Sequence, residues 1–544
     1  MRIWHPVTVA LVVLGLGCVA EQPTTDVLVI PVGDLGSSPV PTLLQGKVAN
    51  RDPADLMFLR LAELPPTLVT SGDDGFVPRL ARSWERRDSV TLVFHLDQRA
   101  RWSDGVPVTA RDVVFAFGRA RDPAIAPSLS SVLTSITDVV AEDDRTVAIK
   151  FGRAFAEQLY TATFHVHPLP AHLLESIDPD SLISSAFVRA PVGDGPYRFA
   201  ELIPGQRLIL TANEDFFLGR PAIDRVVFQL VPDADARLNL LLSGEAGALQ
   251  AISPRDVPRV EADSALEVIV IPTFGLGYLL FNQRDPRHLD RPHPILADVR
   301  VRRAIIQALD RRKMLDAVYH GYADVPQGPV ARLHWIRDTT DLALPYDPGA
   351  TRRLLEEAGW HRTPTGWARN GKALRLTLNY PTTSRSRSQF AQLIQEQLRQ
   401  AGIDLRLNGL DGAIWFDRRK QSDFDIDFSS AAMDPSPSGL QQSWSCAGLG
   451  GSNVGHYCNP SVDSLLTRAI YAQENTLPVW RELLATIRRD APAAFIYSPN
   501  VIFGVSRRYT DVDLVPYSYW SHVWRWRLSD RPVGPAPVSP GSSP

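Results

Sequence analysis

The sequence predicts an α/β protein built from more than one lobe. Short segments of alternating apolar residues, such as 91–96 and 374–378, take turns along the chain with segments of helical periodicity, such as 233–243 and 477–490. No long block is purely helical or purely strand-like, which favours mixed layers. The chain has 544 residues. Because single hydrophobic cores stop growing at about 250–300 residues, we expect at least two lobes.

Predicted helices are marked by capping residues. Thr109 followed by Asp112 has the spacing of a capping box and predicts a helix that ends at Asp122 and Pro123. Asp347 before Pro348 places a cap in front of a proline at the first helical position. The same kinds of signal predict further helices at 233–243, 298–309, 389–400 and 477–490.

Strands are predicted where short apolar runs alternate or lie between turn residues. In the segment 91–96, Leu92, Phe94 and Leu96 should share one face. Further strands are predicted at 27–32, 226–231, 374–378, 405–407 and 424–428.

The amino terminus predicts export. An apolar run from Val7 to Leu16 has the length of a signal sequence and is too short to span a bilayer. Cys18 follows in a Gly-Leu-Gly-Cys run that resembles the lipidation box of bacterial lipoproteins. Cleavage after Ala20 and an uncleaved anchor are alternatives, and each places the body of the protein outside the cytoplasm. We expect 1–18 to be a signal peptide or lipoprotein anchor and 531–544 to be a disordered Pro/Ser tail.

Two cysteines remain if Cys18 is lipidated or removed. Cys446 and Cys458 form an even pair in an oxidising compartment, so we predict a disulfide. A metal site with His456 as third ligand is the alternative, but it has no fourth ligand at a typical spacing. We expect no metal and no cofactor.

Charge and motifs argue against two broad classes of function. The formal net charge is −3, whereas a general nucleic-acid binder usually carries a basic stripe. The sequence contains no Gly-x-Ser-x-Gly elbow, no His-Glu-x-x-His pair, no phosphate-binding Gly-Lys-Ser/Thr loop and no Gly-x-Gly-x-x-Gly fingerprint. We therefore expect neither nucleic-acid binding nor enzymatic activity, and we assign no catalytic residues.

Several short motifs follow one another in a fixed order. The most diagnostic is 78–85 followed by Trp-Ser-Asp-Gly-Val-Pro-Val-Thr-Ala-Arg-Asp-Val-Val-Phe at 102–115. The later runs are Gly193 to Tyr197, Asn282, Asp298 to Ala304, Ala308 to Arg311, Tyr346 to Gly359 and Ser452 to Asn459. From 27 to 528 the chain resembles the extracellular solute-binding proteins, family 5, which serve ABC importers of peptides, nickel and related cargo. The matching residues have structural roles of their own: Trp84 and Trp102 are expected in the core.

The resemblance implies a two-lobed periplasmic-binding-protein-like fold with an extra domain inserted in the first lobe. Crossings near 282–285 and 501–504 would form the hinge between the lobes. In the bend from Gly193 to Pro196, glycine would permit positive φ. The implied division is a first lobe from 19–58, 193–284 and 503–530, an inserted domain at 59–192, and a second lobe at 285–502.

The resemblance also implies a function. A monomeric receptor, anchored by an amino-terminal lipid in the periplasm or on the outer face of the cytoplasmic membrane, would enclose a small ligand, a peptide, between its lobes. It would then deliver the ligand to the membrane permease subunits of an ABC importer. Asp434 is the best match for the acidic residue that takes the amino terminus of a peptide; the alternative is that Asp434 and Pro435 only begin a turn.

The segment before Asp434 departs from the family. Ser429 to Ala432 are all small, where peptide binders usually have an aromatic residue. The pocket is therefore expected to be wider or suited to another cargo, and Ser430 joins the candidate ligand-binding residues. Aromatic candidates near predicted strand ends, each with core packing as its alternative, are Tyr278, Trp444, Trp415 and Tyr517.

Two other functions stay open. A receptor for a metal complex or an oligosaccharide is one, and His165 and His167 would then face the same side of a strand. A strand-to-helix crossing with incidental histidines is the simpler interpretation. The other is a surface sensor that binds a partner protein.

Overall fold

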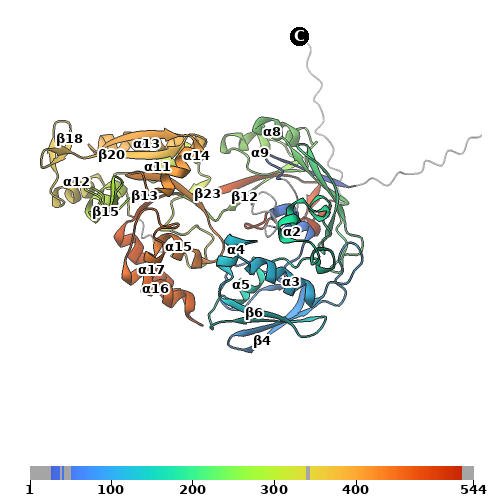
Figure 1. Ribbon diagram of the computed structural model, residues 1–544. Helices are drawn as coiled ribbons and strands as arrows, with labels where there is room; N and C mark the ends of the chain where they lie inside the picture. The colour runs from blue at the N-terminus through green and yellow to red at the C-terminus, as the bar shows by residue number, and fades with distance from the viewer. Residues whose placement is uncertain (1–25, 37–39, 42–50, 339–343, 530–544) are drawn as a thin grey trace, which may run out of the picture.

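The computed structural model describes residues 26–36, 40–41, 51–338 and 344–529, and it has the predicted α/β architecture (Figure 1). The predicted signal segment with Cys18 and the predicted Pro/Ser tail lie outside the described residues. Within the described ranges, no helix combines the length and the apolar character needed to cross a membrane. Figure 1 shows two bodies: one contains α10 to α17, and the other combines the first lobe with the inserted domain below it.

The first lobe is built on a four-stranded sheet in the order β1-β10-β9-β8, in which only β1 and β10 run parallel. The predicted strand at 27–32 is β1, and its residues Leu28 and Ile30 are fully buried. Asp233 caps helix α8 by accepting a hydrogen bond from the amide of Ala236 at 2.7 Å, as predicted. The elements of this lobe are β1 (Val27–Val32), α2 (Arg51–Met57), β8 (Tyr197–Ile203), β9 (Arg207–Ala212), β10 (Arg225–Leu230), α8 (Ala234–Leu242), β11 (Ala248–Leu249), α9 (Val257–Glu261), β12 (Leu266–Pro272), β24 (Tyr509–Thr510) and β25 (Arg527–Leu528).

The inserted domain holds an antiparallel sheet in the order β4-β5-β7-β6, with α3 packed on it. The predicted capping box is present, because the amide of Thr109 donates to Asp112 Oδ2 at 2.7 Å. The indole of Trp102 is buried and donates to the same carboxylate at 3.3 Å. The family motif therefore builds the core. Its elements are β2 (Ala62–Glu63), β3 (Val77–Pro78), β4 (Ala81–Asp88), β5 (Thr91–Leu96), α3 (Ala110–Arg121), α4 (Pro127–Val132), β6 (Ile136–Ala141), β7 (Thr146–Phe151), α5 (Gln158–Thr163), α6 (Ala171–Leu174) and α7 (Ala186–Arg189).

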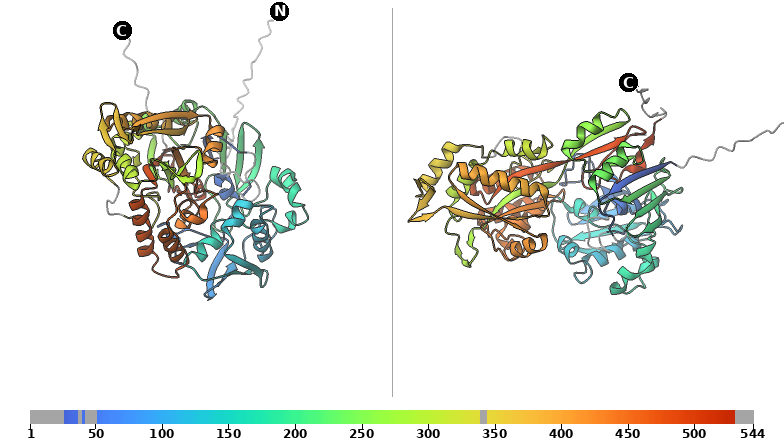
Figure 2. Two further views of the ribbon diagram at one scale, coloured as in Figure 1. Left: turned by 60° about the vertical axis from the view of Figure 1, so that its left-hand side comes forward. Right: turned by 90° about the horizontal axis from the view of Figure 1, so that it is seen from above.

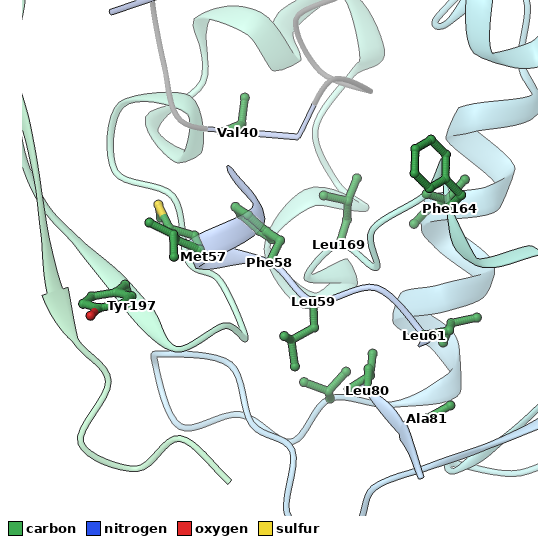
Figure 3. Packing of buried hydrophobic residues seen from close by; sticks show 14 of the residues in the cluster. Val40, Met57, Phe58, Leu59, Leu61, Leu80, Ala81, Phe164, Leu169 and Tyr197 are labelled. Atoms are coloured by element: carbon green, nitrogen blue, oxygen red, sulfur yellow. The ribbon is translucent and has the colours of Figure 1, made fainter. Parts of the chain in front are cut away.

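The inserted domain and the first lobe share one continuous hydrophobic core. Figure 3 shows Met57 and Phe58, which follow each other at the end of α2, between Tyr197 of the first lobe and Leu169 of the inserted domain. All four side chains are buried. Burial of this apolar surface joins the two parts, so they should move as one unit.

The second lobe has a sheet in the order β13-β22-β20-β21 with a hydrophobic core on each face. Alternate residues of β13 enter the two cores: Leu279 and Phe281 pack in one, and Tyr278 and Leu280 in the other. The main elements are β13 (Gly275–Phe281), α10 (Val299–Gln307), α11 (Arg311–Tyr319), α12 (Pro348–Glu357), β20 (Arg375–Pro381), α13 (Arg385–Gln400), β21 (Asp404–Leu410), α14 (Gly412–Lys420), β22 (Ile426–Ala432), α15 (Leu440–Trp444), α16 (Pro460–Tyr471) and α17 (Leu477–Asp490). Short strands complete the lobe: β14 (Arg284–Asp285), β15 (His288–Pro292), β16 (Ala323–Asp324), β17 (His361–Thr363), β18 (Gly366–Arg369) and β19 (Lys372–Ala373).

One long strand, β23 (Ala493–Ser506), belongs to both lobes. Its first residues pair with β13 of the second lobe, and from Asn500 onward it pairs with β12 of the first lobe. In the right-hand view of Figure 2 the strand runs in orange-red from one body into the other. Since β13 pairs with β22, it belongs to the second lobe, whereas β12 belongs to the first. We therefore place the points where the chain passes between the lobes at Phe274 and at 498–500, instead of the predicted 282–285 and 501–504.

Two predicted segments have different bounds in the structure. The helix predicted at 389–400 begins at Arg385, because Ser384 Oγ caps it by accepting from the amide of Arg387 at 3.4 Å. The strand predicted at 424–428 is β22, which begins at Ile426. The side-chain amide of Asn282 donates to the carbonyl of Phe424 at 3.0 Å. This carbonyl is therefore not available for the backbone hydrogen bonds that would extend the strand.

The glycines of the Gly193 to Pro196 bend have a different role from the predicted one. Neither Gly193 nor Gly195 has positive φ. Instead, a Cβ atom at Gly193 would lie 2.0 Å from the carbonyl oxygen of Met57, and one at Gly195 would lie 2.6 Å from that of Leu56. Close approach to the end of α2, and not an unusual backbone conformation, requires glycine here.

Asp194, between these glycines, is a buried carboxyl group. One oxygen accepts from the amide of Leu59 at 2.9 Å, and the other has no hydrogen-bond partner among the described residues. Burial raises the pKa of Asp194 from 3.8 to about 7, against the smaller opposing effect of that hydrogen bond.

We predict that Asp194→Asn relieves a loss of stability at high pH. The folded protein binds the proton of the Asp194 carboxyl group more tightly than the unfolded chain does. The stability contributed by this protonated group is therefore fully present below pH 4 and is lost as the pH rises through about 7. The melting temperature of the variant relative to wild type should therefore rise from pH 4 to pH 8. The corresponding difference in unfolding free energy should grow by up to about 4 kcal/mol over this range. Asp122→Asn, in a surface turn, is the control. A variant-to-wild-type difference that is independent of pH would contradict the prediction.

Candidate functional site

A cavity of about 360 Å³ lies between the inserted domain and the second lobe. Its size is typical of small-molecule sites. In Figure 1, α5 of the inserted domain faces α15 of the second lobe across this region. Among its lining residues are Glu157, Tyr160 and His165 from the inserted domain and Tyr278, Asp434 and Trp444 from the second lobe.

Two of the predicted aromatic candidates form one wall of the cavity. Tyr278 and Trp444 are buried, and their ring centroids lie 6.0 Å apart. Phe495 packs against both rings, at 5.9 Å and 5.8 Å. The wall is therefore part of the second-lobe core. Tyr278 and Trp444 both pack in this core and line the cavity, so the two predicted alternatives are combined in each residue.

Asp434 lies in the segment that follows β22 and lines the same cavity. Its backbone is fixed, because its carbonyl oxygen accepts from Nε2 of the buried His334 at 3.1 Å. Its carboxylate acts electrostatically on His165 and Tyr160 across the cavity. The structure thus brings Asp434, Tyr278 and Trp444 together at one site.

The other predicted candidates lie outside the cavity lining. Ser430 is exposed on β22, opposite Gly277. The indole of Trp415 donates to Asp427 at 2.7 Å, and Tyr517 packs edge-on against Phe164 with the ring centroids 5.5 Å apart. The three positions depend on how the sheet and the core are packed, and the sequence pattern does not determine this packing.

The inserted domain contributes residues that sequence reasoning missed. Glu157 begins α5, and its carboxyl group accepts hydrogen bonds from Thr70 and, at 2.7 Å, from Ser436 of the second lobe. Burial raises the pKa of Glu157. Tyr160 lies one turn further along the helix, and no sequence motif marks either residue.

His165 and His167 do not share a strand face. The segment is irregular, and the two rings have separate surroundings. His165 lines the cavity, where burial lowers its pKa to about 4 and keeps the ring neutral. His167 Nε2 lies 2.7 Å from Asp55 Oδ1, in the core beneath α2. Of the pair, only His165 is placed to meet a ligand.

Direct contacts between described residues join the lobes around the cavity. The indole of Trp335 donates to Thr70 Oγ1 at 2.9 Å, and the amide of Ala156 donates to the carbonyl of Ala472 at 3.0 Å. The guanidinium of Arg153 lies 3.4 Å from the ring centroid of Tyr471. With the Glu157 to Ser436 hydrogen bond, these contacts describe a closed arrangement of the two bodies.

Cys446 and Cys458 are joined by a disulfide, 12 residues apart in sequence. The bond lies just after α15, the helix that carries Trp444. Throughout the described part of the chain, no group of three or more His, Cys, Asp or Glu side chains is arranged to hold a metal ion.

Comparison with known families decides which family the chain represents. Residues 75–451 match the model described as bacterial extracellular solute-binding proteins, family 5. The chain belongs to this family. The resemblance seen in the ordered sequence motifs is confirmed, and so is the predicted fold class.

Named relatives and solved structures agree with this family. The chain is 30% identical over 406 residues to a putative ABC transporter peptide-binding protein of Brucella ovis, covering 73% of each chain. It is 28% identical to a probable di/tripeptide-binding protein of Pseudomonas aeruginosa, covering 83% of this chain and 87% of that one. Its fold matches the oligopeptide-binding protein AppA of Bacillus subtilis, solved with a nonapeptide, with a TM-score of 0.75, 22% identity and coverage of 92% and 99%. It also matches NikZ of Campylobacter jejuni, solved with Ni(L-His), with a TM-score of 0.74, 21% identity and the same coverage.

We predict that the disulfide stabilises the segment after α15. In oxidised protein, Cys446 and Cys458 should resist alkylation until a reductant is added. The double variant Cys446→Ser/Cys458→Ser should lose about 3 kcal/mol of unfolding free energy, since closing a loop of this length restricts the unfolded chain by roughly that amount. Wild type measured with reductant is the control and should match the variant. Alkylation of both cysteines without reductant would contradict the prediction.

Proposed function

We propose that the protein is an extracytoplasmic receptor that captures a peptide with a free amino terminus and delivers it to an ABC importer. One observation carries the proposal: Asp434 lines a cavity between the two bodies, beside an aromatic wall. A carboxylate in such a place forms a charge-assisted hydrogen bond with an ammonium group. The peptide-binding names of the relatives from Brucella and Pseudomonas support this class of cargo.

Capture depends on closure of the two bodies. The inserted domain shares a core with the first lobe, so we expect one movement about the crossings at Phe274 and 498–500. Closure forms the contacts from Glu157 to Ser436 and from Thr70 to Trp335. Because the enclosed ligand is removed from water, each of its hydrogen bonds and ion pairs becomes stronger.

The proposal includes export and attachment to the cell surface. The amino-terminal segment provides the export signal, and Cys18 provides a lipid anchor, or cleavage after Ala20 releases the chain. The receptor acts as a monomer and presents its closed form to the permease subunits.

We predict that freshly purified protein carries peptides, detectable by native mass spectrometry, and that Asp434→Ala does not. Removing the carboxylate leaves the ammonium of the ligand without its charged partner, which should weaken binding about 10-fold or more. Ser430→Ala, on the same segment but outside the cavity, is the control and should carry cargo like wild type. A bound metal complex or oligosaccharide, or unchanged peptide loading of Asp434→Ala, would contradict the proposed cargo or the proposed role.

We also predict that cargo closes the molecule in solution. Small-angle scattering of protein stripped of cargo by unfolding and refolding should give a larger radius of gyration than the structure in Figure 1 implies. Adding back the released cargo should reduce it, because the lobes then share a buried ligand. An equal radius with and without cargo would contradict capture by closure.

A further inference from the structure

A buried carboxyl group lies where the inserted domain meets the second lobe. Glu157, at the start of α5, is 7% exposed and lines the cavity. One of its oxygens accepts a hydrogen bond from Thr70 of the inserted domain, and the other accepts from Ser436 of the second lobe at 2.7 Å. The hydrogen bonds of this group therefore depend on a residue from each body.

The two hydroxyl groups belong to a chain of hydrogen bonds that crosses the cleft. The indole of Trp335, in the second lobe, donates to Thr70 Oγ1 at 2.9 Å. Ser436 Oγ in turn accepts from the amide of Ser438 at 3.1 Å. Both hydroxyl groups are buried. Separation of the two bodies would break the contact from Ser436 to Glu157 and the contact from Trp335 to Thr70 together.

No cation compensates the charge of Glu157 within the described part of the chain. The described lining of the cavity contains neither lysine nor arginine. Among the surrounding segments, His165 and His334 are neutral, because burial lowers the pKa of each to about 4. None of the charged or titratable groups nearby is among the causes that shift the pKa of Glu157. On the elements packed around it, the other such groups are Asp73, Arg86, Arg153, Tyr160, Asp434 and Tyr471.

The enclosed carboxyl group holds its proton more tightly than an exposed one. Burial raises the pKa of Glu157 above its ordinary value of 4.5, and the hydrogen bonds from the two hydroxyl groups oppose this shift only in part. Glu63, which is also buried, shows the opposite behaviour. Its pKa is lowered to about 2, because hydrogen bonds and charges from His522 and Arg79 outweigh the effect of burial. Glu157 has no such partners, so its charged form is the costly one.

We propose that Glu157 is a proton-coupled latch between the inserted domain and the second lobe: closure encloses its carboxyl group between Thr70 and Ser436, and the group takes up a proton there. The inference rests on the proposed capture of cargo by closure and adds a regulation of that movement.

The direction of the regulation follows from the linkage between closure and proton binding. The closed form binds the proton more tightly than the open form, in which water reaches the carboxyl group. The proton therefore stabilises the closed form fully below about pH 4.5, and this stabilisation is lost as the pH rises through the raised pKa. A receptor outside the cytoplasm meets the pH of its surroundings, so cargo is held more tightly when the surroundings are acidic.

The experiment compares the pH dependence of cargo binding in wild type and Glu157→Gln. It uses full-length protein stripped of cargo by unfolding and refolding, with a casein hydrolysate filtered to small peptides as the probe. The hydrolysate concentration that gives half of the maximal rise in melting temperature is measured at pH 5 and at pH 8. Glutamine has the shape and charge of the protonated carboxyl group, so the variant closes without taking up a proton. The half-maximal concentration of wild type divided by that of the variant should increase about 3-fold or more from pH 5 to pH 8.

Two further variants separate a latch from a merely structural role. Ser436→Ala removes a donor to the carboxylate, so its half-maximal concentration should exceed that of wild type at pH 8 and by a smaller factor at pH 5. Glu175→Gln is the matched control, because Glu175 is an exposed carboxyl group of the inserted domain that pairs with Arg111 outside the cavity. This control should behave like wild type at both pH values. A structural role of Glu157 predicts changes of equal size at pH 5 and pH 8.

Failure of the latch and failure of peptide capture give different results. A wild-type-to-variant ratio that is equal at pH 5 and pH 8 would overturn the latch while peptide capture stands. If wild type does not respond to hydrolysate at either pH, peptide capture is overturned, and small-angle scattering of the stripped protein decides about the latch. Wild type should then have a smaller radius of gyration at pH 5 than at pH 8, and Glu157→Gln should not change. A radius of wild type that is independent of pH would overturn the latch as well.

Discussion

The strand β23 is the constraint on which the architecture depends. Its pairing with β13 in one lobe and β12 in the other makes a single backbone ladder continuous through both bodies. Strand ladders resist stretching and shear, so relative movement must be concentrated where the pairing passes from one partner to the other. The cavity is lined by Leu276 and Tyr278, close in sequence to the crossing at Phe274. A small rotation at the crossing would change the distance between α5 and α15, which both contribute lining residues.

The shared core of the inserted domain and the first lobe means that a rotation between the lobes also moves the inserted domain. Because Phe58 and Leu169 are buried in one continuous cluster, α5 is carried rigidly with the first lobe. Glu157 accepts a hydrogen bond from Ser436 of the second lobe at 2.7 Å. The buried carboxyl group has its hydrogen bonds supplied from both bodies, which couples its desolvation to closure.

The small-residue segment before Asp434 and the buried Asp194 have different physical consequences. The small residues from Ser429 to Ala432 lie in a paired strand, and the aromatic wall comes instead from Tyr278 and Trp444 on neighbouring elements. Asp194 is a buried carboxyl group in a bend with no space for Cβ atoms at its flanking glycines. Burial of this carboxyl group costs stability at neutral pH. Asp194 is not among the residues that line the cavity.

Local signals determined much of the fold. Capping at Thr109, Asp233 and Asp347 fixed helix starts because the cap and the amide it binds are neighbours in sequence. The ordered motifs determined the family, since they build the core of the inserted domain. Asp434 was found as a candidate through the family resemblance. Trp444 ends α15, whereas Tyr278 lies in the middle of β13 and not near a strand end as predicted.

Only the tertiary structure decided the rest. The lobe crossings depend on which strands pair with β23, and strand pairing is not encoded in the pattern of one strand. Glu157, Tyr160 and His165 carry no motif, and they become a site only because α5 faces residues more than 250 positions later in the chain.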